Sequence, residues 1–166
     1  MNGTTRDYTG RQVDLECLQT IVEPTGVTEM SLTATQGTSR RVTGMQKAIQ
    51  RYVTLLLTPS SSVPFPAESD NRLLDALRAG AVSNTGYLRH LFNVANAVAL
   101  DIIRRDDYNT SMFGDQRDDE RIASVDLDGV TVDYTTSTLG LSLVFRTAAG
   151  SDYAYVLPVS TSQGRG

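Results

Sequence analysis

The stretch 139-LGLSLVFRTAAGSDYAYVLPV-159 carries the strongest structural signal of the chain. Apolar side chains alternate with small or polar ones on both sides of the breaker AAGSD at 148–152. A period of two is typical of β-strands, and Gly, Ser and Asp favour a tight turn between two strands. The stretch therefore predicts an antiparallel hairpin with alternating apolar residues Leu139, Leu141, Leu143, Phe145, Tyr153, Tyr155, Leu157 and Val159.

One more strand and three helices are expected before this hairpin. Residues 122–134 alternate in patches, with a turn or bulge marked by Asp128-Gly129. Residues 85–105 repeat apolar side chains at intervals of three and four, which is the spacing of a helix face. Shorter helices are expected after Thr43 and from Ser69 or Asp70 to Gly80. The order predicts an α+β fold, with a three-helix segment packed on a C-terminal antiparallel β meander.

The first of these helices is expected to stop abruptly. Thr43 is its candidate N-cap, and its end is predicted where Thr58 precedes Pro59, because a residue before proline is pushed out of the helical region. The segment PSSSVPFPAE at 59–68 follows, and its prolines favour a stiff, extended strap. We expect this strap to hold the next helix at a fixed angle.

The first 41 residues differ from the rest of the chain. They contain short alternating runs around Val13–Cys17 and Met30–Ala34, with a turn predicted at 23–26. These runs hold too little apolar surface to offset the entropy of folding alone. We therefore predict an extended β-prone N-terminal arm at 1–41, one domain at 42–160 and a flexible tail at 161–166.

Composition restricts the partners of the chain. The net charge of −4 leaves no basic stripe for phosphates, so no nucleic-acid partner is expected. Lys47 is the only lysine, and arginine is enriched at protein interfaces, although codon bias explains the same usage equally well. No signal peptide and no membrane-spanning stretch is recognisable, and Cys17 is the only cysteine. We expect a soluble protein that is made in a cytoplasm and contacts no membrane.

Candidate catalytic or metal-binding residues are few. Glycosidases use paired carboxylates, but a catalytic acid needs a dry cleft, and a charge run in a polar loop is typical of solvated surface. His90 lacks the second ligand of a metal motif, and 126–129 lacks the spacing of a calcium loop. We therefore predict no enzymatic activity, no metal and no cofactor. The acidic cluster in question is Asp115, Asp118, Asp119 and Glu120.

Glu120 and Arg121 are adjacent opposite charges at the start of a predicted strand. Neighbouring side chains on a strand point to opposite sides, so each charge must find a separate partner. Two interpretations remain open. Arg121 pairs with a carboxylate at a subunit contact, or both side chains are simply solvated.

Five pieces of the chain occur in a characteristic order over about residues 43–160. They are GMQKAIQRYVTLLLTPSSSVPF, DNRLLDALRAG, the long apolar helix, DDERIASVDL and the β meander. This order resembles the baseplate wedge and sheath-initiator family of contractile tails, which occurs in phages, type VI secretion systems and related injection machines. The family usually has Glu-Pro-Arg-Ile where this chain has Asp119-Glu120-Arg121-Ile122, and an aromatic-glycine step where it has 67–70. Arg121 and Ile122 match directly, and the acid is either Asp119 or Glu120.

The resemblance implies a non-enzymatic baseplate protein. Larger wedge scaffold subunits would hold it around the tail tube, in a sixfold arrangement, through Asp119, Glu120, Arg121 and Ile122. It would nucleate the tail sheath by strand addition, and the tail sheath protein would contact Leu141, Leu143, Phe145, Tyr153, Tyr155 and Leu157. Tail tube or hub proteins are further implied partners. The protein would be part of the virion after assembly in the host cytoplasm.

Two other functions fit the residues. The α+β order also suits another virion connector, such as a neck or tail-completion protein. A small peptidoglycan hydrolase of the muramidase class would use Glu120 as its acid.

Overall fold

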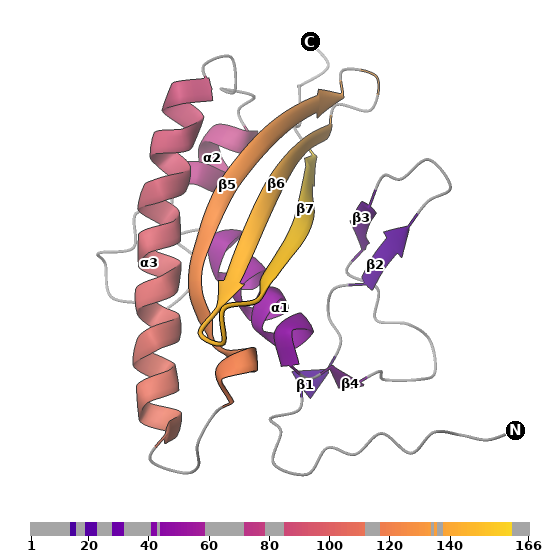
Figure 1. Ribbon diagram of the computed structural model, residues 1–166. Helices are drawn as coiled ribbons and strands as arrows, with labels where there is room; N and C mark the ends of the chain where they lie inside the picture. The colour runs from indigo at the N-terminus through magenta and orange to yellow at the C-terminus, as the bar shows by residue number, and fades with distance from the viewer. Residues whose placement is uncertain are drawn as a thin grey trace, which may run out of the picture.

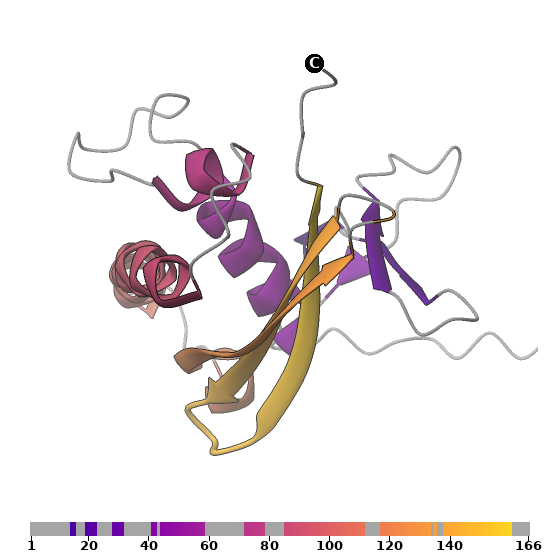
Figure 2. The ribbon, with the colours of Figure 1, turned by 90° about the horizontal axis from the view of Figure 1, so that it is seen from above.

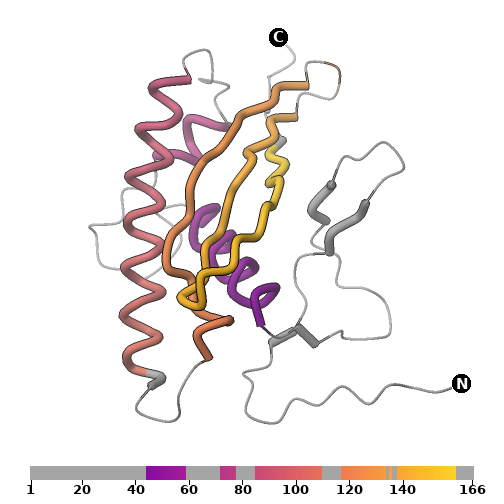
Figure 3. Tube along the Cα trace, viewed as in Figure 1, coloured from indigo at the N-terminus to yellow at the C-terminus, as the bar shows by residue number. Residues whose placement is uncertain are grey.

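The computed structural model describes the backbone of residues 14–15, 19–22, 28–31, 41–42, 44–58, 72–78, 85–111, 117–133, 135 and 138–160 (Figure 1). Figure 3 follows the trace in colour from Gly44 onward. The N-terminal part of these residues forms four short strands, β1 (Asp14–Leu15), β2 (Gln19–Val22), β3 (Thr28–Ser31) and β4 (Arg41–Val42). The remaining elements make up the α+β part of the chain.

An antiparallel sheet lies at the centre of the fold (Figure 1). It consists of β5 (Ile122–Asp133), β6 (Thr138–Thr147) and β7 (Asp152–Ser160), in that spatial order. Phe145 on the central strand pairs with Val125 on one side and Tyr153 on the other. The predicted hairpin over 139–159 is therefore confirmed, and β5 and β7 are the two edge strands.

Three helices cover one face of this sheet. They are α1 (Gly44–Leu56), α2 (Arg72–Arg78) and α3 (Thr85–Ser111). Seen from above, all three lie on the same side of the strands (Figure 2). The predicted α+β fold, with three helices on a C-terminal meander, is confirmed. The opposite face, which we call the open face, has no helix on it among the described residues and presents Thr138, Gly140, Ser142, Val144 and Arg146 from β6.

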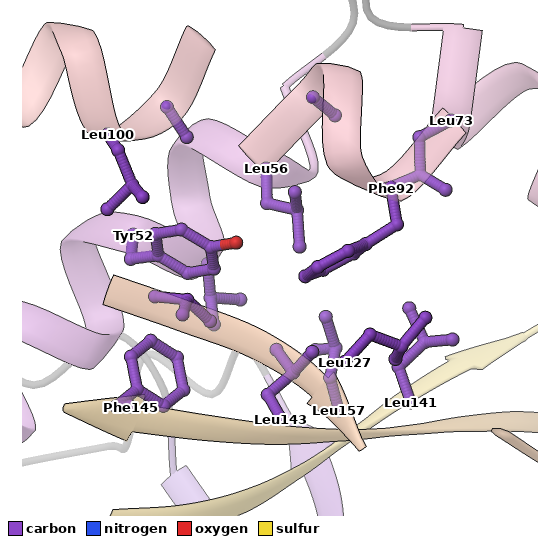
Figure 4. Close-up of a cluster of buried hydrophobic side chains, with 14 of the residues drawn as sticks. Tyr52, Leu56, Leu73, Phe92, Leu100, Leu127, Leu141, Leu143, Phe145 and Leu157 are labelled. Carbon is purple, nitrogen blue, oxygen red and sulfur yellow. The ribbon is translucent and has the colours of Figure 1, made fainter. Parts of the chain in front are cut away.

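The core forms where the inner face of β6 meets the helices. Leu139, Leu141, Leu143 and Phe145 are each at most 1% exposed, as strand alternation requires for one buried face. Each such side chain contributes about 1.5–3 kcal/mol by leaving water. Figure 4 shows several of these residues facing side chains of the helices. The fully buried helix residues include Tyr52, Val53, Leu56, Leu73, Leu77, Leu88 and Phe92.

A short hydrogen-bond relay links α1, α3 and β5. The hydroxyl of the buried Tyr52 donates to Oδ1 of Asn96 at 2.8 Å, and Nδ2 of Asn96 donates to the carbonyl of Val125 at 2.8 Å. The Tyr52 ring packs edge-on against Phe145, with ring centroids 5.1 Å apart. The relay provides partners for polar groups that would be costly to bury alone.

The third helix is longer than its sequence predicts. We expected an end near Arg105, but α3 continues to Ser111. Arg51 of α1 explains the extension, because its guanidinium lies 2.7 Å from Asp106 and 2.8 Å from Asp107. These ion pairs neutralise two carboxylates that would be unfavourable near the negative end of the helix dipole.

Two irregularities interrupt β5. Its register with β6 shifts between Ile122 and Ser124 and again between Leu127 and Gly129. The second shift falls at Asp128-Gly129, where the sequence predicted a turn or a bulge, and it is a bulge within a continuous strand.

In the N-terminal arm, β2 pairs with β3 and β1 pairs with β4, both antiparallel. β3 lies beside β7, although the two strands belong to different sheets. Several expected features lie outside the described residues: the turn at 23–26, the N-cap Thr43, the strap at 59–68, the ends of the second helix at Ser69, Asp70 and Gly80, and the tail at 161–166.

Two tyrosines flank Phe145 and should respond differently to the loss of a hydroxyl. Tyr52→Phe leaves Oδ1 of Asn96 without its donor, so the free energy of unfolding should fall by about 1–2 kcal/mol. The hydroxyl of Tyr155 is buried and has no hydrogen-bond partner among the described residues, so Tyr155→Phe should leave the free energy of unfolding unchanged or raise it. Urea unfolding followed by circular dichroism measures both variants, and equal losses would contradict this difference.

The stability of the protein at alkaline pH tests the burial of Tyr52 and Tyr155. Burial raises the pKa of Tyr155 to about 12 and also raises that of Tyr52, whereas an unfolded tyrosine titrates near 10. The unfolded chain releases these protons first, so stability is complete below about pH 10 and falls as pH rises towards 12. Between about pH 8 and about pH 11, the urea midpoint of Tyr155→Phe should fall less than that of wild type. An identical fall would show that Tyr155 keeps an ordinary pKa.

Candidate functional site

Residues 117–121, which we call the arginine connector, lie directly before β5. They contain one turn of 3-10 helix (Asp118–Glu120), closed by a 2.9 Å hydrogen bond from the Glu120 N–H to the Arg117 carbonyl. Two further backbone hydrogen bonds fasten the connector to the β6–β7 turn. The Ala148 N–H donates to the Arg121 carbonyl at 2.9 Å, and the Ala149 N–H donates to the Asp118 carbonyl at 3.2 Å. The backbone of the connector is thus fixed relative to the hairpin.

The two arginines of the connector are exposed. Nη1 of Arg121 lies 3.1 Å from Oδ1 of Asp118, and Nε of Arg117 lies 3.1 Å from Oδ1 of Asp119. Exposed ion pairs of this kind contribute only about 0–1 kcal/mol. Either guanidinium can therefore exchange its internal partner for a carboxylate of another protein at little cost.

Glu120 points the other way, into the protein. It is only 4% exposed and lines a small pocket together with Lys47, Arg51, Asp107 and Ile122. The 3-10 turn ends at Glu120 and the backbone is extended at Arg121, so the two neighbouring side chains point in different directions. Of the two candidates for the family's acid, Glu120 is the buried one and Asp119 is bonded to Arg117 at the surface.

Four of the predicted sheath-binding side chains belong to the core instead. Leu141, Leu143, Phe145 and Leu157 are each at most 1% exposed and face the helices. A folded chain cannot offer them to a partner, so the prediction of side-chain contacts is wrong for these four. The alternation that identified them marks a buried face of a strand as readily as a docking face.

Tyr153 and Tyr155 lie on β7, at the edge of the sheet. Tyr153 is 41% exposed, whereas Tyr155 is half-buried and its ring packs 6.4 Å from that of Phe145. A contact between this edge strand and a sheath subunit remains a prediction. It would depend on the backbone of β7 and on Tyr153, because the inner side chains are already used by the core.

The remaining candidates do not gather in one place. Asp115 lies outside the described residues, Asp118 and Asp119 lie on the surface, and Glu120 is buried. His90 is exposed on α3. The described part of the chain contains no group of three or more side chains that could hold a metal ion. Nor does it contain a helix long and apolar enough to cross a membrane.

No protein-family model, curated protein or solved structure matches the chain. The likeness to the baseplate wedge and sheath-initiator family therefore rests on the order of the five motifs and on Arg121 and Ile122.

Sequence reading missed three side chains of α3 that act on the outer edge of β5. They donate to successive outward carbonyls of that strand, and we call them the edge caps. Their spacing of seven and eight residues places them on one side of the helix, and this recurrence of polar residues is the signal that could have revealed them. The pairs are Arg89 with the carbonyl of Leu127 (3.2 Å), Asn96 with that of Val125 (2.8 Å) and Arg104 with that of Ala123 (3.1 Å).

Two alanine substitutions in the connector should separate its buried acid from its exposed one. Glu120→Ala removes a buried carboxylate that interacts with its surroundings, so the free energy of unfolding should fall by about 1–3 kcal/mol. Asp119→Ala removes one exposed ion pair and should change it by no more than about 0.5 kcal/mol. Chemical unfolding measures both. A larger loss for Asp119→Ala would mean that the roles of the two acids are reversed.

Proposed function

We propose that this chain is a structural, non-catalytic protein of a contractile tail baseplate. Wedge scaffold subunits bind it at the arginine connector, and the first sheath subunits bind at the edge of its sheet. The observation that carries the proposal is the placement of Arg121. The residue that matches the family's arginine is exposed, on a segment whose backbone is hydrogen-bonded to the hairpin.

The connector is suited to binding carboxylates of another protein. A guanidinium binds a carboxylate through two parallel hydrogen bonds, which gives both affinity and orientation. Among the described residues, Arg121 forms its ion pair with the exposed Asp118, and a carboxylate in a drier interface would form a stronger pair. The backbone is already fixed by its hydrogen bonds to Ala148 and Ala149, so binding costs little additional entropy.

The same hydrogen bonds connect the two proposed binding regions. A scaffold subunit that holds Arg121 also fixes the β6–β7 turn, from which β7 starts. A sheath strand added to β7 would then have a defined position relative to the scaffold, as initiation of an ordered sheath requires. Contacts with tail tube or hub proteins, a sixfold arrangement and a place in the virion belong to the same proposal.

Arg121→Ala tests the scaffold contact, and Arg117→Ala is its matched control. Each variant loses one exposed ion pair of the same connector, so both should fold with a Tm within about 2 °C of wild type. We expect Arg121→Ala to retain about tenfold less scaffold protein in a pull-down after co-expression with the scaffold subunits of the same source. Arg117→Ala should retain nearly as much as wild type.

Equal retention by the two variants would rule out Arg121 as the anchor.

Deletion of the hairpin is not a usable test of the sheath contact. A chain that ends at Thr138 would lose the central strand β6 and, with it, the inner face of the core. Substitutions at the outer edge of β7 are required instead.

A further inference from the structure

The outward face of α3 carries exposed apolar side chains that the contacts proposed above leave in water. Six large apolar side chains of the described residues are exposed, and three of them, Tyr87, Val94 and Tyr108, lie on this helix. They are 48%, 46% and 73% exposed. Single apolar side chains scattered over a surface need no explanation, but a group on one face of one helix indicates a contact with another molecule.

The spacing of these residues forms a line along the helix. Val94 follows Tyr87 by seven residues and Tyr108 follows Val94 by fourteen, so the three side chains share one side of α3. His90 and Ala97 are exposed as well and come three residues after Tyr87 and Val94. Intervals of three, four and seven residues are those of the contact positions in a coiled coil. We call this surface the α3 seam, and its residues are Tyr87, His90, Val94, Ala97, Asp101 and Tyr108.

The α3 seam faces away from the rest of the fold. The opposite side of the helix supplies core residues, among them Leu88, Phe92 and Ala99. In Figure 2, α3 is seen end-on, and the other described helices and strands all lie on one side of it. A helix face that meets only water is normally polar. The seam is instead a second, largely apolar face of the same helix.

The geometry of the seam favours a helix as its partner. Side chains that recur every 3.5 residues on average interlock with those of a second helix, a pattern that a strand, with its period of two, does not match. From Tyr87 to Tyr108 the seam is about 32 Å long, which is about six helical turns. Ala97 lies near its middle and is small, so the two helix axes can approach to about 8–10 Å there.

Charge indicates which kind of helix binds. Arg104 and Arg105 are exposed, and successive residues of a helix are turned by about 100°, so the two arginines flank the seam on its two sides. The seam itself contains Asp101, whose ion pair with Arg105 is also exposed and therefore rearranges at little cost. Two arginines against one aspartate make this surface positive, although the whole chain carries −4. Acidic side chains beside an apolar line would be attracted to it.

A second copy of the chain is a poorer partner for the seam. In a parallel pair, Asp101 would lie against its own counterpart and Arg105 beside the partner's same residue. In an antiparallel pair with Tyr87 opposite Tyr108, Arg105 would lie opposite His90. Neither arrangement places an acid opposite the arginine, and like charges across a helix pair are unfavourable.

We propose that the α3 seam binds an amphipathic helix of a different protein, which has apolar residues along its contact line and Asp or Glu beside them. This inference does not rest on the proposed function, because it uses side chains of α3 alone. It adds a contact surface in which neither the arginine connector nor β7 takes part.

Two synthetic peptides test the seam on the full-length chain. Both consist of heptads with Leu at the a and d positions, and they differ only in having Glu or Lys at every e and g position. Fluorescence anisotropy of the labelled peptides measures their affinities in about 0.1 M salt. The Glu peptide should bind at least about tenfold more tightly than the Lys peptide. Equal affinities, or no binding of either peptide, would overturn the proposal.

Val94→Glu and Val132→Glu form a matched pair of variants. The two valines are 46% and 47% exposed, but Val94 belongs to the seam and Val132 lies on β5. Val94→Glu places a charge in the apolar line, so the affinity for the Glu peptide should fall about tenfold or more. Val132→Glu should change it less than about twofold. Equal weakening by the two variants would place the peptide elsewhere and overturn the seam. If Val94→Glu fails to fold, the comparison of the two peptides on the wild-type chain decides alone.

Arg105→Glu tests the charge of the partner separately from its apolar contacts. The preference for the Glu peptide over the Lys peptide should fall about tenfold or reverse, whereas a loss of packing alone would weaken both peptides alike. An unchanged preference would overturn the acidic partner.

Sedimentation velocity of the free chain tests the remaining occupant. The chain should sediment as a monomer, and a dimer that dissociates on Val94→Glu would show that a second copy occupies the seam, which would overturn the proposal. The scaffold contact is measured with Arg121→Ala and Arg117→Ala, so either proposal can fail without the other.

Discussion

The hydrogen bond from Tyr52 to Asn96 determines how α3 lies against the sheet. Asn96 is shared, because its oxygen accepts from α1 and its nitrogen donates to the outer edge of β5. Without the tyrosine, the amide would lose the partner that orients it in a region with few alternatives. Once Asn96 is fixed, Arg89 and Arg104 are carried to the neighbouring carbonyls of β5, about two helical turns away on each side. A buried polar contact in the core therefore also positions the side chain that caps the middle of the covered part of β5.

The consequence is a sheet whose β5 edge is covered by side chains of α3 over residues 123–127, joined to an exposed arginine on a rigid segment. Both features suit a protein that holds other subunits in a defined geometry. Arg121 of the arginine connector pairs with the exposed Asp118 rather than with a buried acid, among the residues that the structure describes, and the connector's hydrogen bonds to Ala148 and Ala149 transmit its position to the start of β7. Rigid placement reduces the entropy that binding would otherwise cost. Arg51 serves the same end, because its ion pairs with Asp106 and Asp107 secure the last turns of α3 on α1.

Local patterns in the sequence predicted most of the fold, because alternation and helical spacing report which face of an element is buried. The hairpin at 139–159, the bulge at Asp128-Gly129 and the start of α3 at Thr85 all follow from short-range signals. The extension of α3 to Ser111 could not be predicted in this way, since it depends on Arg51, more than fifty positions earlier. The site was harder for the same reason. Alternation identified Leu141 and Phe145 but could not tell that helices already cover them, and the different directions of Glu120 and Arg121 became assignable only with the connector in place.

The most direct test of the account is a cryo-electron microscopy reconstruction of the assembled tail that contains this chain. We predict density for an extended segment of a sheath subunit beside β7, and a carboxylate of a scaffold subunit against Arg121. The edge caps on β5 should be intact in the same map. A chain found in the neck, or in the baseplate with both the β7 edge and Arg121 facing solvent, would contradict the account.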